Sequence, residues 1–241
     1  MHAPPGGTLL LSCGGYRSGS TYCYNLLGSY VELADVGRRI GYVEPSQVPL
    51  LPAVWSFVTA MRTAVGKSHN SPGTAEGAEA WPALLEDPET SVVPVCTVRD
   101  FRDVLHSFSR KFGETPEQVL ESRRWRINLD NLRWWLAAGA LRVDYADLLA
   151  APGKVLGETL AAADIEQDPA LVEQAVEAAS VPAASRTTAG LAEESVDGRT
   201  LLHADHLGDP SGGGWRRWDP ERLAALRPRL EPVLEEFGHA W

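Results

Sequence analysis

The residues from Gly14 to Thr21, GGYRSGST, have the composition and spacing of a phosphate-binding loop. A glycine, four intervening residues, a second glycine and two hydroxyl residues follow one another. The apolar run Thr8–Cys13 before the loop predicts a buried strand, and the stretch from Ser18 to about Leu33 predicts a helix. A loop in that position directs backbone N–H groups and the positive end of the helix toward an anion. The sequence therefore predicts an anion site between a strand and a helix.

The cation of this loop does not stand where nucleotide hydrolases place theirs. Those enzymes need a lysine at the position of Ser20, beside a hydroxyl that holds Mg²⁺. Arg17, three residues earlier, is the one cation within the loop. A sulfuryl group carries about one negative charge less than a phosphoryl group, so N–H donors and one cation can hold it without a metal. We therefore expect a sulfuryl-type anion. Asp100, which follows an apolar strand, could instead hold a metal ion, and this favours a kinase as the alternative.

A second pair of anion-binding residues follows the predicted strand Ser91–Val98. Arg99 stands at the end of this strand, and Ser107 lies about two turns into the predicted helix Asp100–Phe112. An arginine fork donates two parallel hydrogen bonds to phosphate oxygens. Arg99 alone is typical of a solvated strand end, but together with the glycine loop it indicates a second phosphate site.

A candidate general base lies in the segment 66–69, GKSH, which follows the end of another short strand. Withdrawing a proton from a hydroxyl requires a group poised near neutral pH, and histidine is the usual choice, which makes His69 the candidate. Lys67 adds positive charge beside it. The competing histidines are His106, His203 and His206.

Strands alternate with helices along the chain, which predicts an α/β fold with a central parallel sheet flanked by helices. Ligands of such sheets bind beyond the carboxyl ends of the strands, so we expect the residues after Cys13, Val65 and Val98 to converge on one crevice. The other predicted elements are a strand at Leu141–Tyr145 and helices from Ala53 onward and at Thr74–Glu86, Pro116–Leu136, Lys154–Ala163, Pro169–Ala179 and Asp219–Phe237.

The length of 241 residues fits a single domain, 1–241. Residues 181–218 are rich in Gly, Ser, Asp and Thr and show little periodicity. Because this stretch carries Trp215 and Arg216 rather than only polar filler, we expect it to cover a ligand as a lid.

Composition excludes several classes of protein. A net charge of −10 argues against a sequence-blind nucleic-acid binder. The three cysteines, Cys13, Cys23 and Cys96, are an odd number without a close pair, so we expect free buried thiols and neither a disulfide framework nor a zinc site. No stretch approaches the ~20 apolar residues that span a bilayer, and we expect a cytoplasmic protein. The oligomeric state stays open, because the sequence has no heptad run.

The stretch YRSGSTYCYNLL, which begins at Tyr16, resembles the 5′-phosphosulfate loop of sulfotransferases that use 3′-phosphoadenosine-5′-phosphosulfate (PAPS) and release adenosine 3′,5′-bisphosphate (PAP). Tyr16 replaces the usual proline of that family, and Tyr22 replaces a tryptophan that stacks on adenine. The resemblance implies a P-loop-like sulfotransferase architecture with Arg17 as the catalytic cation. It assigns cofactor binding to Ser18, Gly19, Ser20 and Thr21. The aromatic ring of Tyr22 could stack on the adenine in place of the tryptophan.

Two further stretches carry the same resemblance. The segment 98–109, VRDFRDVLHSFS, is similar to the family's 3′-phosphate motif, which makes Arg99 and Ser107 ligands of that phosphate. GKSH is similar to the family's Lys-Thr-His, which makes His69 the general base and Lys67 a second catalytic cation.

Matches toward the C-terminus are looser. Tyr145 falls on the Tyr of a Tyr-Glu-Asp-Leu feature and can approach adenine, and Trp215 and Arg216 fall on a closing Gly-x-Trp-Arg/Lys. The family's Arg-Lys-Gly, which grips the 3′-phosphate, is replaced by the segment 208–210, GDP in one-letter code. One phosphate grip of the family is therefore either missing here or supplied by Arg216 or Arg217.

The resemblance implies a metal-independent sulfotransferase that moves a sulfuryl group to a hydroxyl of a small-molecule acceptor by in-line displacement. A P-loop small-molecule kinase and a non-catalytic nucleotide-binding relative are the alternatives. Trp125, Trp134 and Trp135 favour an apolar or aromatic acceptor if they line its pocket, although aromatic residues on a helix more often belong to the core.

Overall fold

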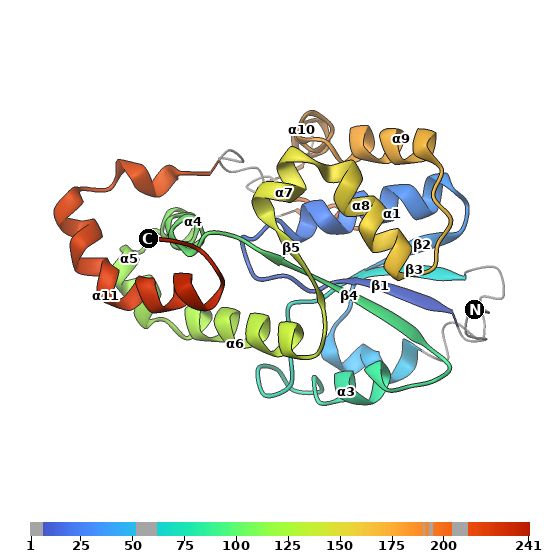
Figure 1. The fold of residues 1–241 in the computed structure, drawn as a ribbon, viewed down its shortest axis with the longest axis horizontal. Helices are drawn as coiled ribbons and strands as arrows, with labels where there is room; N and C mark the ends of the chain where they lie inside the picture. The colour runs from blue at the N-terminus through green and yellow to red at the C-terminus, as the bar shows by residue number, and fades with distance from the viewer. Residues whose placement is uncertain (1–6, 52–61, 190, 193–194, 204–211) are drawn as a thin grey trace.

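The computed structural model describes residues 7–51, 62–189, 191–192, 195–203 and 212–241. In this part of the chain, parallel strands form one sheet in the order β2-β3-β1-β4-β5 (Figure 1). The strands are β1 (Thr8–Ser12), β2 (Gly37–Tyr42), β3 (Thr63–Lys67), β4 (Ser91–Val98) and β5 (Leu141–Asp144). The sheet confirms the predicted α/β fold. The helix predicted from Ala53 falls on residues 53–61, which lie outside the described ranges.

Helices cover both faces of this sheet (Figure 1). They are α1 (Ser20–Leu33), α3 (Ala80–Leu85), α4 (Phe101–Phe112), α5 (Pro116–Glu121), α6 (Arg123–Ala137), α7 (Tyr145–Ala150), α8 (Pro152–Ala162), α9 (Pro169–Ala179), α10 (Val181–Ala189) and α11 (Pro220–Glu236), with 3-10 turns η1 (Pro45–Leu50) and η3 (Gly214–Arg217). Leu10 of β1 packs into a core with α1, α8 and α9, while Leu9 and Leu11 pack into a second core with α3, α4, α6 and α11. Successive side chains of a strand point to opposite faces, so the central strand must be apolar throughout.

Pro94 lies inside β4, where a proline removes a ladder hydrogen bond. The Val95 carbonyl accepts a hydrogen bond from Cys13, so Val95 faces the β1 side and its neighbour Pro94 faces the β5 side. The β5 pairing begins only at Val95, opposite Leu141. The missing N–H of Pro94 therefore falls just beyond the end of β5, where no ladder bond is lost.

Three predictions for helices are wrong in detail. The helix predicted at Pro116–Leu136 is divided at Ser122, whose extended backbone ends α5 and whose hydroxyl caps α6 by accepting from Trp125 N–H. The helix predicted at Thr74–Glu86 is helical only at Ala80–Leu85. The stretch 181–218, expected to lack periodicity, begins with the helix α10.

β2 was not predicted, and its place in the sheet explains why. It is an edge strand with sequence GRRIGY, and only its first residue is fully buried. An edge strand with one partner does not need a continuous apolar run, so its sequence lacks the pattern that marks β1 and β4. The helix α7 was missed as well, because it starts directly at the end of β5.

The tryptophans of α6 belong to the core rather than to a pocket. Trp135 is fully buried and Trp125 nearly so, and Trp135 packs edge-on against Trp81 with ring centroids 5.2 Å apart. Trp134 is partly buried against the same core. The three cysteines are free and buried, as predicted. Among the described helices, none combines the length and apolarity needed to cross a bilayer.

Candidate functional site

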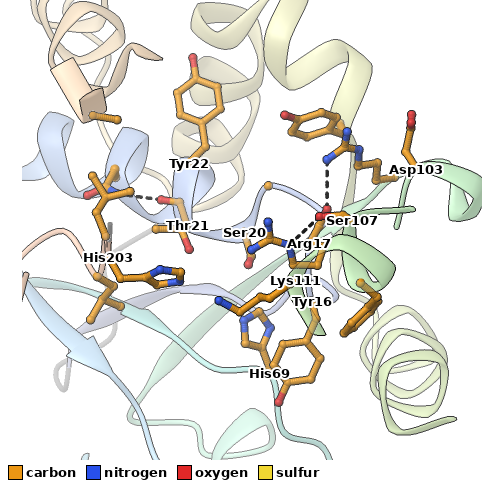
Figure 2. Close-up of a pocket in the computed structure, with 18 of the residues that line it drawn as sticks. Tyr16, Arg17, Ser20, Thr21, Tyr22, His69, Asp103, Ser107, Lys111 and His203 are labelled. Carbon is orange, nitrogen blue, oxygen red and sulfur yellow. Dashed lines mark hydrogen bonds between the residues drawn. The ribbon is translucent and has the colours of Figure 1, made fainter. Parts of the chain in front are cut away.

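A cavity of about 880 Å³ opens at the carboxyl ends of β1, β3 and β4, between the start of α1 and the inner face of α4 (Figure 2). This position confirms that the segments after these three strands converge. Of the residues singled out in the sequence, the cavity is lined by Arg17, Gly19, Ser20, Thr21, Tyr22, Lys67, His69, Arg99, Ser107 and Tyr145.

The glycine loop adopts a conformation that leaves helix amides free for an anion. Arg17 and Gly19 both have positive φ, 63° and 92°. Gly19 is the N-cap of α1, and no side chain caps the helix there. A Cβ at Gly19 would also lie 2.5 Å from the Tyr145 ring, so glycine is required both by conformation and by space. The first-turn N–H groups at Ser20 and Thr21 therefore meet the cavity without a capping side chain.

Ser18 holds the loop in place and does not line the cavity. Its hydroxyl lies 2.5 Å from the Gly15 carbonyl and 2.7 Å from the Thr97 hydroxyl on β4. Its N–H donates to the same Gly15 carbonyl. The hydroxyl and the N–H of this buried residue are thus engaged within the protein, and the assignment of cofactor binding to Ser18 stays a prediction.

Two arginines and a serine connect the loop to the end of β4 and to α4. Arg17 Nε donates to Ser107 Oγ at 2.8 Å, and Arg99 donates to the Arg17 carbonyl at 3.4 Å (Figure 2). The Arg99 guanidinium also lies 4.4 Å from the ring centroid of Tyr145. Residues far apart in the sequence therefore place two guanidinium groups on one wall of the cavity, which suits a ligand with two anionic groups.

Lys67, at the end of β3, is a buried cation facing the loop. Its ammonium donates to Thr21 Oγ1 at 2.6 Å. Burial, with a smaller contribution from the positive charge of Arg17, lowers the pKa of Lys67 to about 7. Within the described ranges, no carboxylate forms an ion pair with this lysine. An anion in the cavity would supply the charge that the protein itself does not provide.

The hydrogen bond of His69 determines which ring nitrogen can act as a base. Nδ1 lies 2.6 Å from the Gly14 carbonyl oxygen, which can only accept, so Nδ1 carries the proton and Nε2 of the neutral ring keeps its lone pair. The His69 ring packs against the Tyr16 ring at 4.3 Å, and the His69 N–H donates to the Tyr42 hydroxyl. These contacts orient a buried histidine at the cavity wall (Figure 2).

The competing histidines have different surroundings. His106 lines the cavity but packs against Trp218, with ring centroids 5.8 Å apart, and contacts the backbone at Gly214. His203 also lines the cavity, at the antiparallel bridge to Val196. His206 lies outside the described residues, as do residues 208–210.

Trp215 and Arg216 are not among the residues that line the cavity. The Trp215 ring is covered by the guanidinium of Arg102 at 4.3 Å and by that of Arg216 at 4.8 Å. Both predicted residues therefore pack beside α4, next to the site. The assignment of cofactor binding to them stays a prediction.

Asp100, the residue that favours a kinase, is engaged in local structure. Its carboxylate caps α4 by accepting from Arg102 N–H and forms an ion pair with the Arg102 guanidinium at 2.6 Å. In the part of the chain that the structure describes, no three His, Cys, Asp or Glu side chains gather as a metal site.

Several lining residues were not singled out from the sequence. Asp103 and Lys111 are spaced four residues on either side of Ser107, so all three lie on one face of α4, and this i, i+4 spacing could have indicated them. The other lining residues that were not singled out are Asn25, Tyr42, Phe108, Arg110, Phe112, Leu149, Ala179, Val181, Ala184, Val196, Leu201, Leu202, Gly212 and Gly214. The stretch 181–218 thus contributes to the cavity wall, while its action as a lid stays a prediction.

Comparison with known proteins identifies the fold. No family model and no curated protein matches the sequence. A crystal structure of retinol dehydratase in a complex with retinol and PAP aligns over 97% of this chain and 82% of its own, with TM-score 0.61 and 16% identity. Mouse sulfotransferase SULT7A1 complexed with PAP aligns over 98% and 86%, with TM-score 0.59 and 13% identity. The sulfotransferase domain of the Synechococcus PCC 7002 olefin synthase aligns over 100% and 97%, with TM-score 0.60 and 19% identity.

The sheet order and the glycine loop define an α/β protein with a cavity at the carboxyl ends of its strands, where α1 begins without a capping side chain. The alignments cover nearly the whole chain. The protein has the sulfotransferase fold, as the resemblance in the sequence implied.

Proposed function

We propose that this protein is a PAPS-dependent sulfotransferase that transfers a sulfuryl group to a hydroxyl of a small-molecule acceptor. The observation that carries the proposal is the convergence of three separate segments on one cavity: the uncapped loop, the Arg99–Ser107 pair and His69. The similar structures that contain PAP support it, because their shared fold covers nearly all of this chain.

The residues present fit a nucleotide with two anionic ends. The α1 amides at Ser20 and Thr21, together with Arg17 and Lys67, would hold the 5′-phosphosulfate, and the uncompensated Lys67 ammonium supports this choice. PAPS, when bound, supplies the sulfuryl group.

The second phosphate would be held by Arg99, which follows β4, and by Ser107, about two turns into α4, both of which line the cavity. Tyr22 and Tyr145 would flank the adenine, with Leu149, Val181 and Ala184 forming the rest of that wall. The Tyr145 ring, which lies against the Arg99 guanidinium, would thus border both the adenine and the second phosphate.

His69 would take the proton of the acceptor hydroxyl at Nε2, because Nδ1–H is held by the Gly14 carbonyl. Arg17 stays charged at any working pH and would balance negative charge as a fixed cation. Lys67, with a pKa of about 7, would be drawn to its charged form by the anion beside it. Positioning and charge stabilisation would thus supply most of the catalysis, as in phosphoryl transfer.

An apolar or aromatic acceptor suits the remaining wall of the cavity. Phe112 and Val196 are 40% and 56% exposed, and both line the cavity. Large apolar side chains that stay exposed around a cavity indicate a surface that a ligand covers. Two of the similar structures, both of retinol dehydratase, contain retinol or androsterone, which supports an acceptor of this kind.

Calorimetry with PAP and with Mg-ATP tests the choice of nucleotide. We expect PAP to bind and Mg-ATP to bind at least tenfold more weakly. Selective binding of Mg-ATP would replace the proposal with a kinase. Radiolabelled PAPS with a panel of phenols and alcohols then tests turnover. Tight PAP binding without transfer to any acceptor or to water would favour a non-catalytic nucleotide-binding protein.

A further inference from the structure

The glycine run 212–214 forms a turn against α4, beside the wall that carries Arg99. Gly212 and Gly213 both have φ of 75°, and Gly212 and Gly214 line the cavity. A Cβ at Gly212 would lie 2.8 Å from Asp103 Oδ2 and 3.7 Å from a guanidinium nitrogen of Arg99. The backbone of the turn therefore packs directly against the side chains of the proposed second-phosphate subsite.

Each glycine of this turn is required for a local reason. The left-handed backbone at Gly212 and Gly213 disfavours any side chain. A Cβ at Gly213 would lie 2.1 Å from the Arg216 guanidinium, and one at Gly214 would lie 2.5 Å from the His106 ring. The turn is thus shaped to lie close to α4 and to the residues that follow it.

Asp103 is the side chain that fixes the turn. Its carboxylate accepts a hydrogen bond from Gly213 N–H at 2.6 Å. Burial raises the pKa of Asp103, while the charge of Arg99 and the N–H groups of Gly213 and Gly214 oppose that rise. The carboxylate is therefore held by backbone N–H groups on one side and by the field of a guanidinium on the other. Figure 2 shows Asp103 at the rim of the cavity, beyond Ser107.

Arg99 depends on these neighbours for its orientation. It is bounded by the Tyr145 ring, by the Arg17 carbonyl and by the turn that Asp103 holds.

We propose that Asp103 is a positioning residue that fixes the Gly212–Gly214 turn beside Arg99 and so completes the subsite for the second phosphate. This inference rests on the proposed function, since it assumes a nucleotide with a 3′-phosphate. The Gly213 N–H and the positive charge of Arg99 both favour the charged carboxylate and so reduce its repulsion of a bound phosphate.

Calorimetry of Asp103→Ala with PAP and with adenosine 5′-monophosphate tests this role. We expect PAP to bind about tenfold more weakly, equal to about 1.4 kcal/mol, while adenosine 5′-monophosphate changes less than twofold. Asp103→Asn, which keeps one acceptor oxygen, should lose less than Asp103→Ala. Unchanged or tighter PAP binding in Asp103→Ala, or an equal loss for both nucleotides, would overturn the role of Asp103.

Gly213→Ala provides a second variant that leaves α4 intact. It should also weaken PAP selectively, because a Cβ is strained at the positive φ of Gly213 and displaces the turn from Asp103. The double variant should lose less than the sum of the two, because both substitutions disturb the same contact. Asp130→Ala, which removes an exposed carboxylate on α6, is the charge-matched control and should leave both affinities unchanged. Additive losses in the double variant would contradict a shared interaction.

Hydrogen exchange separates this inference from the proposed function. In the nucleotide-free protein, Asp103→Ala should speed exchange at the amides of Gly213 and Gly214, and unchanged exchange there would refute the positioning role. A wild-type protein that binds PAP no better than adenosine 5′-monophosphate would refute the proposed second-phosphate site. The two failures thus give different readouts.

Discussion

Replacing His69 by asparagine or by alanine separates its two roles, as a base and as a hydrogen-bond donor. The imidazole Nδ1–H donates to the Gly14 carbonyl at 2.6 Å, and His69 is buried. An asparagine amide can donate to the same carbonyl but has no basic nitrogen. Alanine removes both the base and the donor. The two variants should therefore agree in turnover and differ in stability.

The magnitudes follow from this geometry. Loss of a general base lowers turnover by roughly 10²- to 10⁴-fold, and we expect this in both variants. Only the alanine variant leaves the buried Gly14 carbonyl without its donor, which costs about 1–3 kcal/mol. For a chain of this length each kcal/mol lowers the melting temperature by about 2–4 °C, so His69→Ala should melt about 2–12 °C below His69→Asn.

Three measurements check the prediction: turnover with radiolabelled PAPS, PAP affinity by calorimetry and thermal unfolding. PAP affinity should stay within about threefold in both variants, because neither removes a cation of the loop. Turnover of His69→Asn within tenfold of the wild type would show that Nε2 is not the base. Equal melting temperatures of the two variants would refute the assigned hydrogen bond.

Three further substitutions test the surrounding site. Lys67→Met should abolish proton uptake on PAP binding. At pH 8 a lysine with a pKa of about 7 is mostly neutral, and a bound anion raises that pKa, so the wild-type protein takes up at most about 0.9 proton. Calorimetry in buffers of different ionisation enthalpy measures this uptake. Gly19→Ala should destabilise the protein by about 2 kcal/mol or more, since it adds a contact 2.5 Å from the Tyr145 ring to the cost of a positive φ, as seen in urea unfolding. Ser107→Ala should weaken PAP binding about five- to tenfold, because it removes the hydrogen-bond partner of Arg17 Nε together with a phosphate ligand.

Lys67 also predicts a pH dependence of stability. Its pKa falls from 10.5 in the unfolded chain to about 7 in the folded protein, so the unfolded state takes up the proton first as pH falls. Stability of the nucleotide-free protein should therefore decrease as pH falls from about 10 to 7, and Lys67→Met should remove this part of the dependence. A pH profile of Lys67→Met that matches the wild type would contradict a buried, titrating lysine.

Controls for the other two substitutions come from the chain itself. Gly73 has φ of 80° with no atom near an added Cβ, so Gly73→Ala reports the backbone strain alone. Equal destabilisation by Gly19→Ala and Gly73→Ala would show that the Tyr145 contact is unimportant. PAP binding of Ser107→Ala at wild-type affinity would exclude Ser107 from the phosphate site.

The sequence by itself determined the parts of this protein that depend on short stretches. The strand β1 and the glycine loop can both be predicted from short stretches of sequence. A strand buried on both faces must be apolar throughout, and a helix whose first amides bind an anion begins without a side chain that caps them. β4 follows the same rule despite Pro94, and α4 carries its own N-cap in Asp100. The loop, the strands and the cap each depend on residues a few positions apart, so their patterns can be recognised in the sequence alone.

The tertiary structure alone decided how these stretches meet. The hydrogen bond from His69 to Gly14 spans 55 residues, and that from Gly213 to Asp103 spans 110. Such pairs leave no periodic pattern in the sequence, because the two partners lie far apart along the chain. Lys67 was predicted as a cation of the site, but its burial, its hydrogen bond to Thr21 and the edge strand β2 were not. Burial and pairing are properties of the packed chain, in which parallel strands bring distant residues to one edge of the sheet.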